Sequence, residues 1–377
     1  MPVKDRIVSW WIQNIVIPKR EIIDKPGFVI TTFTEKNQIT YLRDIFIAEH
    51  LFELIETKTV ENYGEKGKQA LYSAGKKFGY IYSSMSNFPT ITNSSKEKFS
   101  EFAYLLIKYI GGIYAQQATH DLNLEEKAFT ITFKDYIICR HNGLGYIMND
   151  GSIAGIWTYA IQDKTIEGIQ LECQGRGNDC CLTFCAPEKK IQEKTSIYFS
   201  EKELPELKFD ETYKKLNEIK ETTYAKNSLK DLIDIGFFRY RKGILSYKDM
   251  RFFGCESHLL YLLEQEISRL DGGEELLFET CFEYGRLLQE LYGHKDYKKF
   301  ISDFFPALGF GDILVIDSDE LKIGVTNYPW TVFSNQSKYI IFRGIMSGFV
   351  SNSLDRVIKF NNFDINTRGY LTLMIKT

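Results

Sequence analysis

The sequence of 377 residues has no excess of positive charge, few cysteines and no long apolar run, and each absence excludes a class of protein. Its 47 Lys and Arg residues are outnumbered by 50 Asp and Glu residues, so it lacks the basic surplus with which nucleic-acid-binding proteins neutralise phosphates. Seven cysteines are too few for a disulfide-built scaffold in a chain of this length. We therefore expect no nucleic-acid partner.

The chain also lacks the apolar segments that enter or cross a membrane. No uninterrupted apolar run is long enough to span a bilayer, and the N-terminus has no signal-peptide pattern. We therefore expect no transmembrane segment and a cytoplasmic location. Hydrophobic residues make up 44% of the chain and aromatic residues 15%, which is enough apolar surface to stabilise folded domains.

A charged segment at 188–244 divides the chain into two halves of similar size. Polar, charge-rich stretches of this kind are typical of linkers between domains. The sequence therefore predicts an N-terminal extension at 1–39, a first domain at 40–187, a charged linker at 188–244 and a second domain at 245–377.

The two halves contain the same order of sequence features, which predicts an internal duplication. A histidine within a leucine-rich helical stretch, His50 or His258, is followed by a helical stretch that ends at Gly79 or Gly285. Another aromatic-rich helical segment comes next, at 98–112 and at 295–311. Leucines at helical spacing around both histidines (Leu51, Leu54, Leu259 and Leu262) also predict that the two domains pack against each other through the helices of their first halves.

Strand-like alternation and a G-x-x-x-G segment follow in both halves. The alternating positions are Phe129, Ile131 and Phe133 in the first half, and Leu321, Ile323 and Val325 in the second. The glycine pairs are Gly151 with Gly155, and Gly344 with Gly348, and we expect them to approach the sheet or a dimer partner closely. The order predicts an α+β fold with two similar domains, each with helices packed on an antiparallel sheet.

Three polar features are expected to be structural. His50 and His258 occupy equivalent places and are interpreted as packing residues, and His120 with Asp121 is predicted to lie in a surface turn. The basic and aromatic tract that begins at Arg239 is interpreted as a strand edge or turn, because no helix-turn-helix pattern accompanies it.

The first half ends in a cysteine-rich motif, Glu172-Cys173 followed by Gly177 and Cys180-Cys181-Leu182-Thr183-Phe184. This motif resembles the signature that closes domains of the 4-vinyl-reductase (4VR) family, and the upstream glycine pair fits the same domain. The second half resembles the family in layout only, because Asn362 and Tyr370 stand where the cysteine pair would be. The chain is therefore similar to a tandem 4VR protein with a degenerate second copy.

The resemblance implies a ligand-binding or regulatory module whose fold is similar to that of TRAPP tethering subunits. In phenol-sensing members, zinc is held by a Cys-x7-Cys pair, a Glu before it and an upstream Cys. Here the pair corresponds to Cys173 and Cys181, while the other two positions hold Gln170 and a residue near Tyr146.

Zinc is thus the metal to expect, with Cys139, Glu172 or Cys185 completing the site. Cys180 and His141 are near in sequence, but Cys180 and Cys181 point to opposite faces of a strand. The alternatives are that the cysteines are small buried hydrophobic residues, or that they form a redox pair.

The sequence supports no acid, base or nucleophile constellation, so we expect a protein that is not an enzyme. The leading hypothesis is a regulatory protein that binds a small hydrophobic ligand and acts through a protein partner. The alternatives are a scaffold or assembly subunit without a ligand, and an accessory protein of tetrapyrrole or cofactor metabolism.

Overall fold

The computed structural model describes most of the chain after the first 18 residues. The described residues are 19–35, 38–92, 94–115, 117–136, 143–144, 147–205, 222–241, 244–292, 296–317, 320–331, 337–366 and 370–375.

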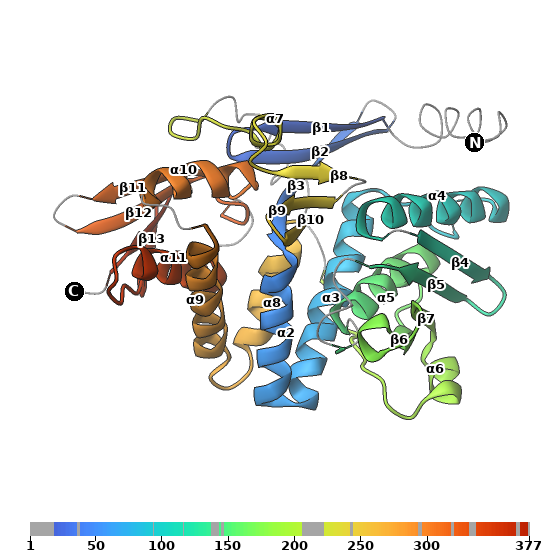
Figure 1. Ribbon diagram of the computed structural model, residues 1–377. Coiled ribbons are helices and arrows are strands. Elements are labelled where there is room, and N and C mark those ends of the chain that lie inside the picture. Colours follow the sequence, from blue (N-terminus) through green and yellow to red (C-terminus); the bar gives the residue numbers. More distant parts are fainter. Residues whose placement is uncertain are drawn as a thin grey trace.

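A six-stranded antiparallel sheet lies at the centre of the molecule and takes strands from both halves (Figure 1). Its order is β1 (Lys19–Lys25), β2 (Phe28–Glu35), β3 (Gln38–Ala48), β10 (Met250–Glu256), β9 (Ile244–Tyr247) and β8 (Arg239–Arg241). β3 and β10 pair at its middle and therefore join the two halves through backbone hydrogen bonds.

The first half continues from β3 with helices and then a second antiparallel sheet. Its elements are α2 (Glu49–Tyr63), α3 (Glu65–Met85), α4 (Lys96–Tyr114), β4 (Gln117–Asn123), β5 (Ala128–Lys134), α5 (Ile147–Ile161), β6 (Ile166–Glu172) and β7 (Cys181–Pro187). The four strands have the order β4-β5-β7-β6.

The second half continues from β10 in the same way. Its elements are α8 (His258–Ser268), α9 (Gly273–Tyr292), α10 (Tyr297–Ala307), β11 (Asp312–Asp317), β12 (Leu321–Thr326), α11 (Ile340–Ser353), β13 (Asn362–Ile365) and β14 (Leu371–Met374). Its four strands have the order β11-β12-β14-β13, so both halves place their strands alike. The α+β class is confirmed, with helices packed on antiparallel sheets.

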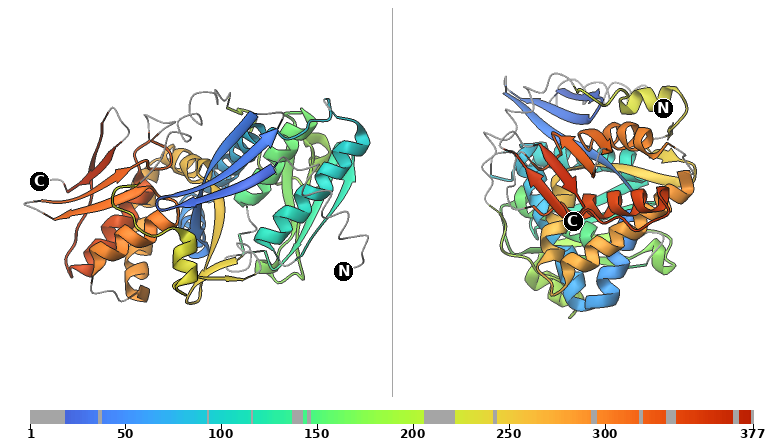
Figure 2. Two further views of the ribbon diagram at one scale, coloured as in Figure 1. Left: turned by 90° about the horizontal axis from the view of Figure 1, so that it is seen from above. Right: turned by 90° about the vertical axis from the view of Figure 1, so that its left-hand side faces the viewer.

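The halves share one continuous hydrophobic core instead of having one each. α2 packs against α9, and α3 packs against α8 (Figures 1 and 2). Of the four leucines from which this packing was predicted, Leu51, Leu259 and Leu262 are buried and Leu54 is half-buried. The helix faces at the contact between the two halves are therefore buried, whereas two independent domains would expose them to solvent.

The glycine pair of α5 contacts a helix, not the sheet or a dimer partner that the sequence led us to expect. A Cβ atom on Gly155 would lie 2.1 Å from the carbonyl oxygen of Lys76, and one on Gly79 would lie 1.9 Å from that of Ser152. Only residues without a side chain allow α3 and α5 to cross this closely.

The second half repeats this crossing between α9 and α11. A Cβ atom on Gly285 would lie 2.2 Å from the carbonyl oxygen of Ile345, and one on Gly348 would lie 1.9 Å from that of Phe282. The six glycine landmarks of the sequence thus mark two equivalent helix crossings.

Arg43 of β3 ties the N-terminal strands to the second half from a buried position. Its Nη2 atom donates to the carbonyl oxygens of Gly27 at 2.6 Å and Gly309 at 2.7 Å, and its guanidinium lies 4.2 Å from the ring centroid of Phe28. Burial lowers the pKa of Arg43 to about 9. A buried cation held by carbonyl groups requires this geometry to remain intact.

Two of the three predicted boundaries fall within secondary structure, while the boundary between 187 and 188 lies between β7 and α6. The boundary between 39 and 40 lies inside β3, and the boundary between 244 and 245 lies inside β9. The linker region contains two short helices, α6 (Glu188–Lys194) and α7 (Leu229–Asp234). None of the helices among the described residues is long and apolar enough to cross a membrane.

Candidate functional site

Cys173 and Cys181 lie next to each other where β6 and β7 meet the turn between them. Glu172 pairs with Leu182 in the ladder, so the antiparallel register brings Cys173 opposite Cys181. Both side chains are buried, and the backbone N–H of Gln174 donates to the Cys181 Sγ at 3.4 Å. Gly177 closes the turn with a positive φ of 92°. The structure therefore brings the motif's cysteine pair together.

Glu172 and Cys180 interact with each other outside this buried pair. The Cys180 thiol donates to Oε2 of Glu172 at 3.1 Å. Burial, and then the adjacent carboxylate, raises the pKa of the Cys180 thiol to about 11. Because zinc binds the thiolate and must displace this proton, the raised pKa weakens zinc binding by Cys180.

Cys185 lies too far along β7 to share an ion with Cys181. Four residues of strand span roughly 13 Å, whereas a zinc ion holds its sulfur ligands at about 2.3 Å. Burial raises the pKa of the Cys185 thiol well above its usual value, with the nearby Asp150 acting in the same direction.

The described residues do not supply a complete zinc site. Cys139 and His141 lie outside them, and within them no group of three or more His, Cys, Asp and Glu side chains could hold a metal ion. Two thiols alone do not make the four-ligand site that zinc prefers. Zinc binding stays a prediction that depends on Cys139.

A buried polar network lies between β6 and α3. The ammonium of Lys76 is 2.7 Å from Oε2 of Glu167, and neither side chain is exposed. The Tyr72 hydroxyl donates to Oε2 at 2.7 Å, and the Ser200 hydroxyl donates to Oε1 at 2.8 Å. Burial lowers the pKa of Lys76 and raises that of Glu167, and their attraction opposes both effects. The network fastens α3, β6 and the segment after α6 to each other.

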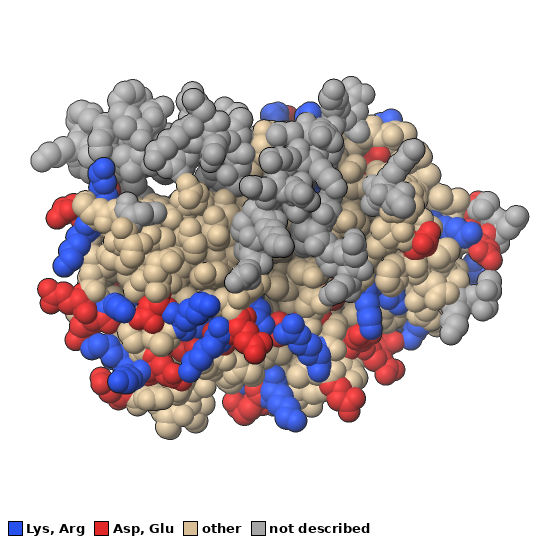
Figure 3. Space-filling model, turned by 180° about the vertical axis from the view of Figure 1, so that it is seen from behind, with Lys and Arg blue, Asp and Glu red and all other residues tan. Residues whose placement is uncertain are grey.

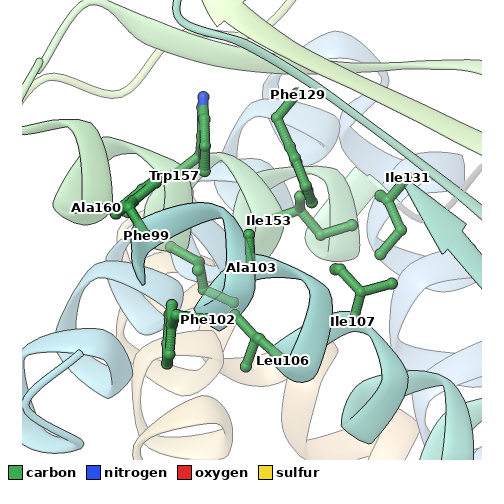
Figure 4. A pocket seen from close by; sticks show the side chains of 11 residues that line it. Phe99, Phe102, Ala103, Leu106, Ile107, Phe129, Ile131, Ile153, Trp157 and Ala160 are labelled. Atoms are coloured by element: carbon green, nitrogen blue, oxygen red, sulfur yellow. The ribbon is translucent and has the colours of Figure 1, made fainter. Parts of the chain in front are cut away.

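An apolar cavity of about 30 Å³ lies between α4, α5 and β5 (Figure 4). The side chains that line it are Phe99, Phe102, Ala103, Leu106, Ile107, Phe129, Ile131, Ile153, Ile156, Trp157 and Ala160. Phe129 stacks on Trp157 with ring centroids 4.8 Å apart, and the indole N–H donates to the carbonyl oxygen of Lys127. Because the indole N–H is engaged, the cavity offers apolar contacts to a ligand.

Aromatic side chains fill the corresponding space between α10 and α11 in the second half. The ring of Phe300 stacks on Phe349 at 5.1 Å and on Phe304 at 4.8 Å.

Two sequence interpretations of polar features have different outcomes. His120 and Asp121 lie within β4, not in a turn, because the alternation of exposed and half-buried residues continues through them. Arg239 begins the edge strand β8, as predicted. On the face of the molecule in Figure 3, the described Lys and Arg side chains are interspersed with Asp and Glu.

The sequence analysis did not find the cavity or the buried network. In the sequence, the residues that line the cavity look like any other core residues. Only the small side chains of Ala103 and Ala160, among larger ones, indicate that the core is not filled there. Lys76 lies next to a second lysine in a helical stretch, so nothing in the pattern distinguishes a buried lysine from an exposed one.

Comparison with solved structures shows a structural likeness to a sensory domain. No family model matches the chain, and no curated protein matches it. The chain is similar to the crystal structure of the phenol-responsive sensory domain of the transcription activator PoxR with phenol, at 14% sequence identity and a TM-score of 0.28. The match covers 44% of this chain and 92% of that chain. Membership of the 4VR family stays a prediction carried by the cysteine motif.

Proposed function

We propose that the chain is a regulatory protein whose first half binds a small apolar molecule in the cavity between α4, α5 and β5, and that it acts through a protein partner. The cavity itself is the observation that carries the proposal, because all 11 side chains around it are apolar. Side chains that line an apolar cavity lack van der Waals contacts on the cavity side, and an apolar ligand supplies these contacts.

The size of the cavity sets a condition on binding. A cavity of roughly 150 Å³ accepts benzene, whereas this one measures about 30 Å³. A ring-sized ligand therefore requires α4 to move away from α5 and β5. Such a ligand binds the expanded conformation and shifts the population toward it. The movement of α4 is the signal that ligand binding sends to the protein partner.

The contacts of α5 supply a route from the cavity to the second half. α5 crosses α3 through backbone contacts at the glycines, and α3 packs against α8. The Lys77 ammonium of α3 lies 2.9 Å from the Glu266 carboxylate of α8. A displacement of α5 is therefore transmitted to α3 and α8, where a partner can sense it.

Thermal unfolding with phenol, toluene and benzene tests the proposal. A ligand that binds only the folded chain raises its stability, by about 2.7 kcal/mol at a concentration of 100 times Kd. Ala103→Leu fills the cavity and should abolish this stabilisation. Thr119→Leu, which places the same side chain on the exposed face of β4, should retain it. No stabilisation of the unmodified chain would contradict ligand binding and favour the scaffold hypothesis.

A further inference from the structure

Trp157 carries the only hydrogen-bonding group among the 11 described side chains that line the cavity between α4, α5 and β5. Its indole N–H donates to the carbonyl oxygen of Lys127 at 3.0 Å. Figure 4 shows the indole nitrogen directed away from the α4 side chains Phe102 and Leu106. The ring centroid of His120 lies 6.0 Å from that of Phe129, but His120 is not a lining residue. These lining side chains therefore offer a ligand no free hydrogen-bonding group.

The turn between β4 and β5 holds the Lys127 carbonyl group where the indole needs it. Lys127 has a left-handed backbone conformation there, with a φ of 53°, and its N–H donates to the carbonyl oxygen of Leu124 at 3.3 Å. Its ammonium lies 2.6 Å from the carboxylate of Asp163, which follows the end of α5. The turn is thus tied to α5 through both the main chain and the side chain of Lys127.

Expansion of the cavity leaves these contacts in place. A ring-sized ligand enters when α4 moves away from α5 and β5, and neither Trp157 nor Lys127 belongs to α4. The stacking of Phe129 on Trp157, with centroids 4.8 Å apart, also joins β5 to α5 without α4. The lining side chains of α4 are themselves apolar, so the wall of the expanded cavity stays apolar on every side that these elements form.

We propose that the cavity selects ligands without a hydrogen-bonding group, such as aromatic hydrocarbons, and rejects their hydroxylated counterparts, an inference that rests on the proposed function. A hydroxyl group loses its hydrogen bonds to water when it enters an apolar site, and this cavity supplies no replacement. Toluene and phenol have nearly the same shape and therefore isolate this effect. Because an apolar site rejects a hydroxylated isostere by about a hundredfold at most, toluene should bind about tenfold to a hundredfold more tightly than phenol.

Calorimetric titration of the full chain with toluene and with phenol tests the selectivity. The expected result is a Kd for toluene at least about tenfold below that for phenol. Phenol that binds as tightly as toluene would overturn the selectivity but leave the proposed function intact. Binding of neither ligand would contradict the proposed function, and the selectivity with it.

A pair of variants at Ile131 of β5 tests whether the apolar wall causes the preference. Ile131→Thr and Ile131→Val give the buried wall side chains of nearly the same size, of which only threonine carries a hydroxyl group. A hydrogen bond to the ligand should reduce the preference for toluene about threefold to tenfold in the threonine variant relative to the valine variant. The same preference in both variants would overturn the proposal. Circular dichroism confirms that each variant is folded.

Trp157→Phe tests the role assigned to the indole. This variant removes the N–H that Lys127 accepts and enlarges the cavity, so the Kd values of both ligands should change together. The ratio of the two Kd values should stay within about threefold of the wild-type ratio, because the ligand does not use the indole N–H. A loss of affinity for phenol alone would show that the indole donates to the ligand and would overturn the proposal.

Discussion

Phe46 of β3 and Gly254 of β10 lie directly opposite each other in the strand pair that joins the two halves. Each lies four positions before the histidine of its own half, His50 or His258. When equivalent positions of two antiparallel strands face each other, a local twofold axis passes between them. The join therefore has the geometry of a symmetric dimer interface within one chain.

Gly254→Val tests the close packing at this axis. A Cβ atom at position 254 would lie 3.3 Å from the Phe46 ring, so a branched side chain forces the ring to move. We expect a loss of about 1–3 kcal/mol in the free energy of unfolding, measured by urea denaturation. Phe46→Leu should recover part of it, because it makes room for the valine. Additive losses in the double variant would show that the two side chains do not interact.

A second test concerns the ion pair between Glu49 of α2 and Arg251 of β10. The carboxylate accepts two hydrogen bonds from the guanidinium, at 2.6 and 2.9 Å, and both side chains are largely buried. Glu49→Ala removes both of these hydrogen bonds from the buried guanidinium, whose Nη1 atom keeps the Asp135 carboxylate at 3.9 Å, and we expect it to lower the free energy of unfolding by about 3 kcal/mol.

The exposed pair of Lys58 and Glu61 on the same helix supplies the control. Glu61→Ala should change the free energy of unfolding by less than about 1 kcal/mol, because exposed pairs contribute little. Similar effects of Glu49→Ala and Glu61→Ala would show that the buried pair does not hold the halves together.

The elements of each half could be predicted from the sequence because their patterns are strong. Phe129, Ile131 and Phe133 alternate in β5 and are buried on one face, and 98–112 forms most of α4. The sequence also indicated that the glycines of α3 and α5 permit a close approach, but not which element approaches them. A close approach requires a glycine whether a helix or a sheet lies opposite, so the sequence could not tell that the two helices cross each other.

The central sheet and the cavity could not be predicted. β8 has three residues and β9 has four, too few to show a period, so their equivalence to β1 and β2 was hidden. The cavity results from how α4 rests on α5, and packing of this kind depends on tertiary geometry that no local pattern encodes. The buried pair of Lys76 and Glu167 joins residues far apart in the chain, and neither residue alone indicates burial.

Glu264 of α8 makes stability depend on pH. Its carboxylate is buried and accepts hydrogen bonds from the Ser337 hydroxyl at 3.0 Å and the Ile341 N–H at 3.2 Å. Burial raises its pKa from 4.5 to about 6. Between these values the folded chain binds more protons than the unfolded chain, so stability falls as the pH rises through this window and then levels off.

Glu264→Gln should remove this dependence. We expect the wild type to lose about 2 kcal/mol more than the variant between pH 4.5 and pH 7, since one pKa unit corresponds to about 1.4 kcal/mol. Urea unfolding of both proteins across this range measures the difference. Glu61→Gln, at an exposed site, should keep the wild-type slope. Identical slopes for Glu264→Gln and the wild type would mean that Glu264 does not titrate in this window.

The cysteine pair supplies the last prediction, because it distinguishes a metal site from buried thiols. Cys173 and Cys181 are brought together, but a zinc ion also needs two further donors, of which Cys139 is the candidate outside the described residues. The zinc hypothesis therefore predicts about one ion per chain, lost from both Cys173→Ser and Cys139→Ser. Cys281→Ser, which changes a buried cysteine in the second half, should retain the metal. Protons compete for thiolates, so bound zinc should decrease as the pH falls. Elemental analysis of protein purified without chelators measures the metal. A metal-free wild type that a chelator does not destabilise would show that the pair is packed as thiols.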